Sequence, residues 1–291
     1  MTAYPADLHL HSVFSDGLRT PGELVQKAVK LRLRWIALCD HDTLAGLPAF
    51  TKAVSEARAA GEGNLRGVPS IELSAGAEAK THLLGYGVDP EHPGLVAYLS
   101  KAAEQRALRI HLILERLEQL GVRLSPESAD QLRRVATSRA HIARALIAQG
   151  EVHTVQQAFD RYLAVGKSAY VPRVAPSALE ITALIRQAGG VPVLAHPCRL
   201  KLEPPALTAL LDELRQAGLE GLEVWHPSTG RRDAAWLEAY ARSHGLLVTG
   251  GSDYHGDRNT RVAMGRMPSG WRAVNEDAQA LLNRVAASYR R

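Results

Sequence analysis

The chain has 291 residues, of which 46% are hydrophobic and 22% charged, an ordinary mixture for a soluble globular protein with a sizeable core. No apolar run approaches the roughly 20 residues of a membrane span, and the first residues lack the basic start and apolar stretch of a signal peptide, so we expect neither a membrane span nor a signal peptide. The net charge is +5, with 28 Arg and 7 Lys. This excess favours an anionic substrate, because guanidinium groups match phosphate geometry, and it equally fits a GC-rich genome.

The first strands and helices alternate regularly along the chain. Seven short apolar runs are predicted as buried strands, over residues 6–10, 35–39, 67–73, 82–86, 191–195, 219–225 and 246–249. Helical periodicity separates them, over residues 20–33, 44–60, 177–188, 205–217 and 231–244. Such alternation predicts parallel strands with right-handed crossovers. Seven strands are more than a small open sheet needs, so they predict an α/β barrel or near-barrel.

One interval breaks this alternation. More than a hundred residues separate the strand at His82 from the strand at Val191, whereas an ordinary crossover needs about 30. The excess is predicted as helices only, over 99–120, 138–149 and 154–165, each followed by the glycine expected at a helix C-terminus. We therefore expect a metal-binding barrel of residues 1–96 and 173–291, and a small all-helical insertion of residues 97–172 that covers the active site.

Cysteine is rare in this chain. Only Cys39 and Cys198 occur, and a disulfide framework in a secreted domain of this size usually has more. We expect both to fill the core of a cytoplasmic protein that has no membrane anchor and no obligate protein partner.

Every predicted strand carries a His, Asp or Glu, and six of the seven carry it at or just past their carboxyl ends. Active sites of parallel α/β barrels lie at that rim, so we expect these side chains to form one site. The residues, in chain order, are His9, His11, Asp40, His41, Glu72, His82 (within the fourth strand), His196, His226, Asp253 and His255.

Several of these residues have the spacing of metal ligands. His9 and His11 are two apart on a strand and share a face, and Asp16 follows in a Ser-Asp-Gly turn that can return over the same rim. The Asp-His-Asp triplet at 40–42 follows an apolar strand, where burying its charges is costly, so we expect a cation as its partner. The set exceeds the four ligands of one tetrahedral zinc. It suits two to three divalent ions, Mn²⁺ first, with Fe²⁺ or Zn²⁺ as alternatives.

Taken together, the motifs resemble those of the polymerase and histidinol phosphatase (PHP) superfamily. They are DLHLHSVFSDG at residues 7–17, Asp-His-Asp at 40–42, His-Pro at 196–197 and Asp-Tyr-His at 253–255. Within that superfamily, SRAHIA at 138–143 and AYVP at 169–172 resemble the branch of 3′,5′-nucleotide bisphosphate phosphatases and the related 5′→3′ exonuclease RNase AM.

The resemblance implies a distorted seven-stranded (βα)7, TIM-like barrel with a trinuclear metal centre. The ligands it implies for the first ion are His9, His11, Glu72 and Asp253. The second ion would share Glu72 and add His82 and His196, and the third would take Asp16, His41 and His255.

The resemblance also implies an activity. We expect metal-dependent removal of the 3′-phosphate from nucleoside 3′,5′-bisphosphates, such as adenosine 3′,5′-bisphosphate, with 5′→3′ exonuclease action on short 5′-phosphorylated RNA as an extension. His226 and Asp253 are the candidate catalytic residues, because an acid must protonate the leaving ribose oxygen. The candidate substrate-binding residues are Arg134, Arg139, Arg199 and His226.

Three other readings share part of this pattern. A histidinol-phosphate phosphatase has the same metal site but needs a pocket for a cation, which a basic insertion would not help. An amidohydrolase also begins with His-x-His but often uses a carbamylated lysine at a strand end, and no predicted strand ends in lysine. A non-catalytic metal-binding regulatory module would not need a complete set of metal ligands. This sequence has the complete set, which argues against such a module.

Overall fold

The computed structural model describes residues 6–62, 64–76, 80–135, 138–173, 175–256, 262–266 and 271–288. The chain divides into two compact units. The first unit comprises residues 1–96 and 175–291, and the second comprises residues 97–174.

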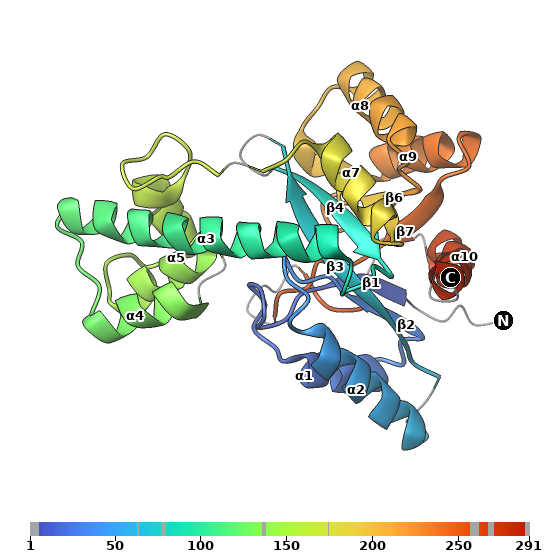
Figure 1. Cartoon of the computed structure of the whole chain (residues 1–291), viewed down its shortest axis with the longest axis horizontal. Helices are drawn as coiled ribbons and strands as arrows, with labels where there is room; N and C mark the ends of the chain where they lie inside the picture. The colour runs from blue at the N-terminus through green and yellow to red at the C-terminus, as the bar shows by residue number, and fades with distance from the viewer. Residues whose placement is uncertain are drawn as a thin grey trace. The chain divides into compact units, whose positions relative to one another are not determined.

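The first unit is built on seven strands that lie in sequence order, β1-β2-β3-β4-β5-β6-β7 (Figure 1). The strands are β1 (Ala6–Leu10), β2 (Trp35–Leu38), β3 (Arg66–Ala75), β4 (Thr81–Tyr86), β5 (Val191–Leu194), β6 (Gly221–Trp225) and β7 (Leu247–Gly250). Beyond the two outer strands, the backbone N–H of His11 donates to the carbonyl of Tyr254 at 3.1 Å. The strands therefore form a nearly closed barrel, and the predicted fold class is confirmed.

The prediction that all strands are parallel is wrong for β4. It pairs antiparallel with both β3 and β5, whereas the other neighbouring strands pair parallel. Only residues 76–80 connect β3 to β4, and so short a connection cannot hold the crossover that a parallel pair needs. Because β4 is reversed, its amino end, which carries His82, lies at the rim where the parallel strands end.

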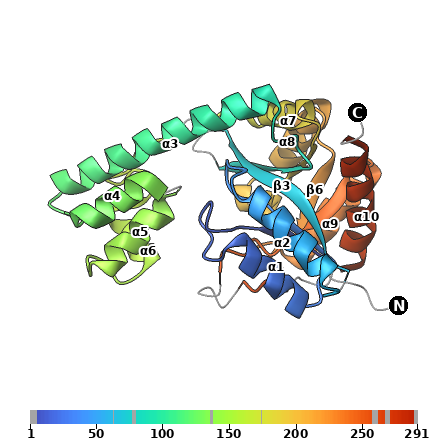
Figure 2. The ribbon, with the colours of Figure 1, turned by 60° about the horizontal axis from the view of Figure 1, so that its bottom comes forward.

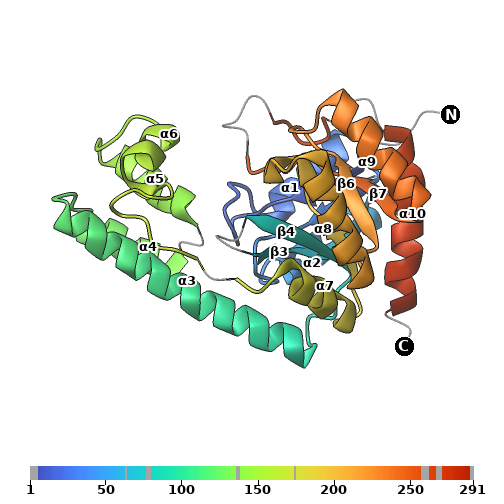
Figure 3. The ribbon, with the colours of Figure 1, turned by 90° about the horizontal axis from the view of Figure 1, so that it is seen from above.

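Helices cover the outside and the floor of the barrel. They are α1 (Pro21–Lys30), α2 (Leu47–Ala59), α7 (Ala178–Gln187), α8 (Pro204–Gln216), α9 (Arg231–Ser243) and α10 (Trp271–Ser288). Thr20 and Ser177 begin α1 and α7 with capping boxes, in which the hydroxyl accepts from a backbone N–H one turn later. Figure 2 shows α1 and α2 side by side, with α2 next to β3, and Figure 3 shows α9 and α10 beside β6 and β7.

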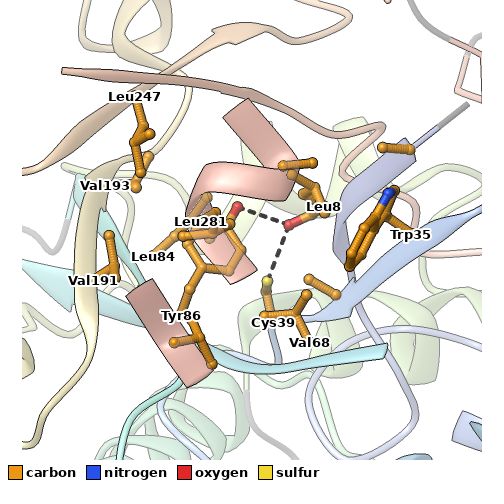
Figure 4. Packing of buried hydrophobic residues seen from close by; sticks show 14 of the residues in the cluster. Leu8, Trp35, Cys39, Val68, Leu84, Tyr86, Val191, Val193, Leu247 and Leu281 are labelled. Atoms are coloured by element: carbon orange, nitrogen blue, oxygen red, sulfur yellow. Dashed lines mark hydrogen bonds between the residues drawn. The ribbon is translucent and has the colours of Figure 1, made fainter. Parts of the chain in front are cut away.

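The inside of the barrel is apolar at the end opposite the rim. There Leu281 and Val285 of α10 pack against strand residues that include Leu8 and Tyr86 (Figure 4). The Tyr86 hydroxyl donates to the carbonyl of Leu8 at 2.9 Å, and the thiol of Cys39 lies 3.4 Å from the same oxygen. The sequence predictions include no helix at α10, yet this helix closes the floor of the barrel.

In the second unit the regular structure of the described residues is all helical, with no strand. The long helix α3 (Pro93–Gln119) enters it, followed by α4 (Pro126–Val135), α5 (Arg139–Ala148), α6 (Val155–Ala158) and a π-helical turn (Phe159–Leu163). Its own core includes Ile113, Leu117, Ile142 and Leu146. The predictions missed α4, and the expected position of this insertion over the rim stays a prediction. Within the described ranges, no helix is long and apolar enough to span a membrane.

The approach of β7 to β1 depends on Gly251. A Cβ at this position would overlap the Cβ of His9 and lie 2.5 Å from its backbone nitrogen. We expect Gly251→Ala to force β1 outward, to cost about 1–3 kcal/mol of stability and to reduce bound metal, as measured by thermal unfolding and elemental analysis.

The matched control is Gly22→Ala. Gly22 lies in α1, and nothing lies within 4 Å of its added Cβ. This change should leave metal content intact and raise stability slightly, because alanine favours a helix over glycine. Wild-type melting and metal content in Gly251→Ala would contradict the proposed close approach.

Candidate metal centre

The ligand-type side chains are on the same faces of the strands as the apolar side chains of the barrel interior, but nearer the rim. On β3, Val68 belongs to the apolar interior, and Glu72 lies four residues later on the same face. Cys39, next to β2, also belongs to that interior, and His41 follows two residues later. At both strands the side chains that face the barrel interior therefore change from apolar to ligand-type toward the rim.

His9 and His11 reach the interior because β1 changes register. The pairing of β1 with β2 shifts between Asp7 and Leu10. Leu8 accordingly packs inside the barrel, whereas Leu10 packs in the outer layer with α1 and α2. The shift turns both imidazoles inward, and their ring centroids lie 5.0 Å apart.

Glu72 lies at the centre of the imidazoles and is fully buried. Its Oε2 lies 3.2 Å from Nε2 of His9 and 3.3 Å from Nε2 of His11. Its Oε1 lies 2.9 Å from Nδ1 of His82 and 3.0 Å from Nε2 of His196. Burial raises the pKa of Glu72, but the surrounding imidazoles outweigh it and hold this pKa well below its usual value.

Asp253 approaches the same imidazoles from the loop after β7. Its Oδ1 lies 3.2 Å from Nε2 of His11 and 3.7 Å from Nε2 of His9. Its backbone has a φ of +53°, a conformation that L-residues rarely adopt. Burial raises the pKa of Asp253, but His255 and other imidazoles lower it well below its usual value, so the carboxylate is ionised.

Asp16 brings a third carboxylate to the rim. Its Oδ1 lies 3.0 Å from Nε2 of His255 and 3.9 Å from Nε2 of His41. Nδ1 of His41 in turn lies 3.0 Å from Oε2 of Glu72. Burial lowers the pKa of His41 to about 4, so a neutral imidazole, the form that binds metals, lies between two carboxylates.

Three groups of side chains are close enough to hold a metal ion, among the residues that the structure describes. They are His11 with Asp16, His41 and His255; His9 with His11 and Asp253; and His41 with Glu72 and His82. Every residue that the sequence proposes as a metal ligand is thus in one of these groups or, like His196, in contact with Glu72. Two residues, His11 and His41, belong to two groups each.

The chemistry of this cluster fits divalent metal ions. Nε2 of His9, both ring nitrogens of His11 and Oε2 of Glu72 are buried without a partner in hydrogen-bond geometry. Buried polar atoms in proteins almost always have such a partner. Imidazole nitrogens and carboxylate oxygens that converge in this way are the donor set of borderline divalent ions.

The same carboxylates raise the proton affinity of the imidazoles. Burial lowers the pKa of His11, but Asp253 and Glu72 outweigh it and raise this pKa to about 10. The pKa of His9 is also well above its usual value, because Glu223 and Glu72 outweigh burial. A proton and a metal ion compete for the same lone pair, so the field that attracts the proton attracts the metal.

The expected cation partner for both carboxylates of the triplet at 40–42 is wrong. Asp40 accepts from the backbone N–H of Ser12 at 2.7 Å and from its hydroxyl at 2.6 Å. Asp42 accepts from the backbone N–H of Ser74 at 2.9 Å and from its hydroxyl at 3.0 Å. Only His41 joins the metal-ligand cluster, and the two carboxylates hold neighbouring rim segments in place.

A cavity of about 560 Å³ opens onto the cluster, lined by rim ligands together with Arg199, His226 and Ser228. Arg199 donates from Nη1 to Oδ2 of Asp253 at 2.8 Å, and about half of its side chain is exposed. Nε2 of His226 lies 3.4 Å from the same oxygen. The backbone N–H of Ser228 donates to Nδ1 of His226 at 3.0 Å, so the ring proton is on Nε2, toward Asp253.

The other two arginines proposed for substrate lie in the second unit. The side chain of Arg134, in α4, falls outside the described residues. Arg139 donates from Nη1 to the carbonyl of Leu163 at 2.7 Å, and its guanidinium lies 5.3 Å from the ring centroids of both Phe159 and Tyr170. Their contact with substrate stays a prediction.

The sequence predictions missed Glu223, on β6. It is fully buried, and it accepts from Nδ1 of His9 at 2.9 Å and from the backbone N–H of His196 at 2.7 Å. Because a carboxylate only accepts here, it fixes the proton of His9 on Nδ1 and leaves Nε2 free to bind a metal. The signal was present in the sequence, since a glutamate between Leu222 and Val224 in a buried strand needs a partner.

The comparisons with known proteins agree with this geometry. The model of the PHP domain family matches residues 7–171. The 5′-3′ exoribonuclease Rnm of Salmonella typhimurium is 35% identical over 251 residues, which cover 86% of this chain and 84% of that protein. A 3′,5′-nucleoside bisphosphate phosphatase of Chromobacterium violaceum is 34% identical over 257 residues, which cover 86% of each chain. The crystal structure of a metal-dependent phosphoesterase from Bifidobacterium adolescentis has a TM-score of 0.80 and 32% identity, over 97% of both chains.

The role of Glu223 can be tested with Glu223→Gln. If the glutamine oxygen keeps the N–H of His196, its amide donates to His9 and moves the ring proton to Nε2, which then cannot bind a metal. We expect the metal affinity of the apoprotein, measured by competition with a chelating dye, to fall about 10–100-fold. Glu220→Gln is the control, because Glu220 is half-exposed and pairs with Arg284. An affinity within about twofold of wild type in Glu223→Gln would refute this role.

Proposed function

The chain belongs to the PHP domain family of metal-dependent phosphoesterases, and from this premise we propose that it removes the 3′-phosphate from nucleoside 3′,5′-bisphosphates. Adenosine 3′,5′-bisphosphate would give AMP and phosphate. The similarity to the Chromobacterium violaceum phosphatase over most of both chains supports this substrate class.

The observation that carries the proposal is the position of Asp253. Its Oδ1 faces the imidazoles of His9 and His11, and its Oδ2 accepts from the guanidinium of Arg199. Asp253 therefore joins the proposed metal ligands to the arginine proposed for phosphate binding, at the wall of the cavity. A cavity of this size is within the range of small-molecule sites.

We propose two to three divalent ions, Mn²⁺ first, with Fe²⁺ or Zn²⁺ as alternatives. The first would be held by His9, His11, Glu72 and Asp253, the second by Glu72, His82 and His196, and the third by Asp16, His41 and His255. Such ions lower the pKa of water and neutralise charge on phosphoryl oxygens.

The side chains around the cavity supply the remaining chemistry. The half-exposed guanidinium of Arg199 presents N–H donors to a phosphate beside Asp253. His226 holds its proton on Nε2, where it can donate to the leaving ribose oxygen. Arg134 and Arg139 are proposed for the second phosphate. Both cysteines are unpaired, which suits the proposed cytoplasmic location.

A second candidate activity is 5′→3′ hydrolysis of short 5′-phosphorylated RNA. The similarity to the Salmonella typhimurium exoribonuclease favours it. The chemistry also favours it, because a 3′,5′-bisphosphate and the 5′ end of such an RNA both present a 5′-phosphate beside a 3′-phosphoester. One site can therefore serve both substrates.

A substrate panel tests the proposed function. The Mn²⁺-loaded protein is given adenosine 3′,5′-bisphosphate, histidinol phosphate and short 5′-phosphorylated RNA, and phosphate and nucleotide products are measured. We expect phosphate and AMP from the bisphosphate, none from histidinol phosphate, and loss of activity on chelation. Preference for histidinol phosphate would favour that phosphatase instead. Bound metal with no turnover of any phosphoester would favour a regulatory module.

The role of His226 is tested with His226→Ala on two leaving groups. Removing a donor that stabilises developing negative charge costs about 10²–10³ in kcat, and we expect such a loss with the bisphosphate. Nitrophenyl phosphate has a leaving oxygen that needs little stabilisation, so its kcat should fall less than about tenfold. An equal loss with both substrates would show that His226 acts on the phosphoryl group instead.

A further inference from the structure

The net positive charge of the chain lies in the second unit. Residues 97–174 contain 12 Lys and Arg against 7 Asp and Glu, whereas the rest of the chain contains 23 of each. The surplus of five charges in this unit therefore equals the net charge of the whole chain, +5. The barrel unit thus has a net charge of zero, whereas the helical unit has a net charge of +5.

Part of this charge is concentrated around Tyr170. Arg109 donates from Nε to the carbonyl of Val171 at 2.9 Å, and Arg116 donates to the carbonyl of Tyr170. The guanidiniums of Arg109 and Arg139 lie 6.0 Å and 5.3 Å from the Tyr170 ring centroid. These partners are uncharged carbonyl oxygens and an aromatic ring, so they do not neutralise the guanidiniums. Three positive charges therefore lie close together around Tyr170.

Further cations of this unit are on its surface. Lys101, Arg123, Arg133 and Lys167 are exposed. Arg123 and Arg133 each have a carboxylate 3.7 Å away, but exposed pairs of this kind are screened by water and contribute little. These four side chains can therefore meet an anionic partner without disturbing the helical core.

We propose that residues 97–174 form a binding surface for the phosphate backbone of single-stranded RNA. This inference rests on the proposed function and makes RNA a main substrate class. A nucleoside 3′,5′-bisphosphate carries about four negative charges. The metal ions and arginines proposed for its two phosphates already meet these charges, so the exposed cations of the helical unit are available to a longer anion. Successive backbone phosphates match such a surface, because each contact releases condensed counterions and adds affinity that falls with salt.

The test measures binding without catalysis. A fluorescent 12-nucleotide RNA with a 5′-phosphate is titrated with the protein in chelator, across a range of salt concentrations. The insertion variant is Lys101→Gln, Arg123→Gln, Arg133→Gln and Lys167→Gln. The control makes the same change at four exposed cations of the barrel unit, Lys52, Arg58, Arg231 and Arg232.

We expect the insertion variant to bind RNA at least about tenfold more weakly, and the slope of log affinity against log salt to become shallower by about 0.7 per lost phosphate contact. The barrel control should match the wild type in both quantities. A double variant, Lys101→Glu with Lys167→Glu, gives the same comparison with fewer changes if the fourfold variant unfolds.

Kinetics separate this inference from the proposed function. The kcat/KM for the RNA should fall in the insertion variant, while that for adenosine 3′,5′-bisphosphate stays within about twofold. Equal RNA affinity in both variants, or binding to anionic phospholipid vesicles in place of RNA, would overturn the inference even in an active enzyme. RNA binding that depends on the four cations in a protein without phosphoesterase activity would leave the inference standing and refute the proposed function.

Discussion

The structure of the site depends on one buried carboxylate, that of Glu72. Transfer of an anion from water to the protein interior costs much free energy unless positive or polar groups surround it. Imidazoles from β1, the loop after β2, β4 and the loop after β5 meet that requirement. Their ring nitrogens converge because they share this partner, and the carboxylates of Asp16 and Asp253 approach the same group from other loops. The centre is therefore one electrostatic unit in which removal of any one member leaves its neighbours uncompensated.

Three features of strand geometry bring these side chains to the same rim of the barrel. Side chains two residues apart share a face, so an apolar residue deep in the barrel predicts a ligand nearer the rim, as with Val68 and Glu72. The reversal of β4 then brings His82 to the rim from the start of a strand instead of its end. The register shift in β1 does the same for His9, which would otherwise face the opposite side from Leu8.

The sequence predicts the barrel, its strands and the cluster of rim residues, because these follow from periodicity and from the order of polar residues after apolar runs. It does not predict the partners of Asp40 and Asp42. Either serine hydroxyls or a metal ion can stabilise a buried carboxylate, and the sequence alone does not show which of the two lies nearby. The reversal of β4 follows from the length of its connection, a simple signal that strand–helix alternation obscures. The helix α10 has apolar residues at helical spacing, Ala278, Leu281 and Val285, so its sequence carries a signal that the predictions overlooked. Its role at the barrel floor appears only when Leu281 and Val285 meet strands from distant parts of the chain.

The proximity of His9 and Asp253 also has a consequence for how the protein folds. These residues are separated by most of the chain, with the whole helical unit between them. Contacts between such distant residues form late, because loop-closure entropy opposes them until the intervening chain is ordered. During synthesis Glu72 follows β1 early in the chain, whereas Asp253 is added only after the whole helical unit, so the last carboxylate can reach His9 and His11 only when the barrel closes. The full set of side chains around Glu72 is therefore assembled only in the closed barrel, so the geometry of the site is a property of the finished fold and not of any segment of it.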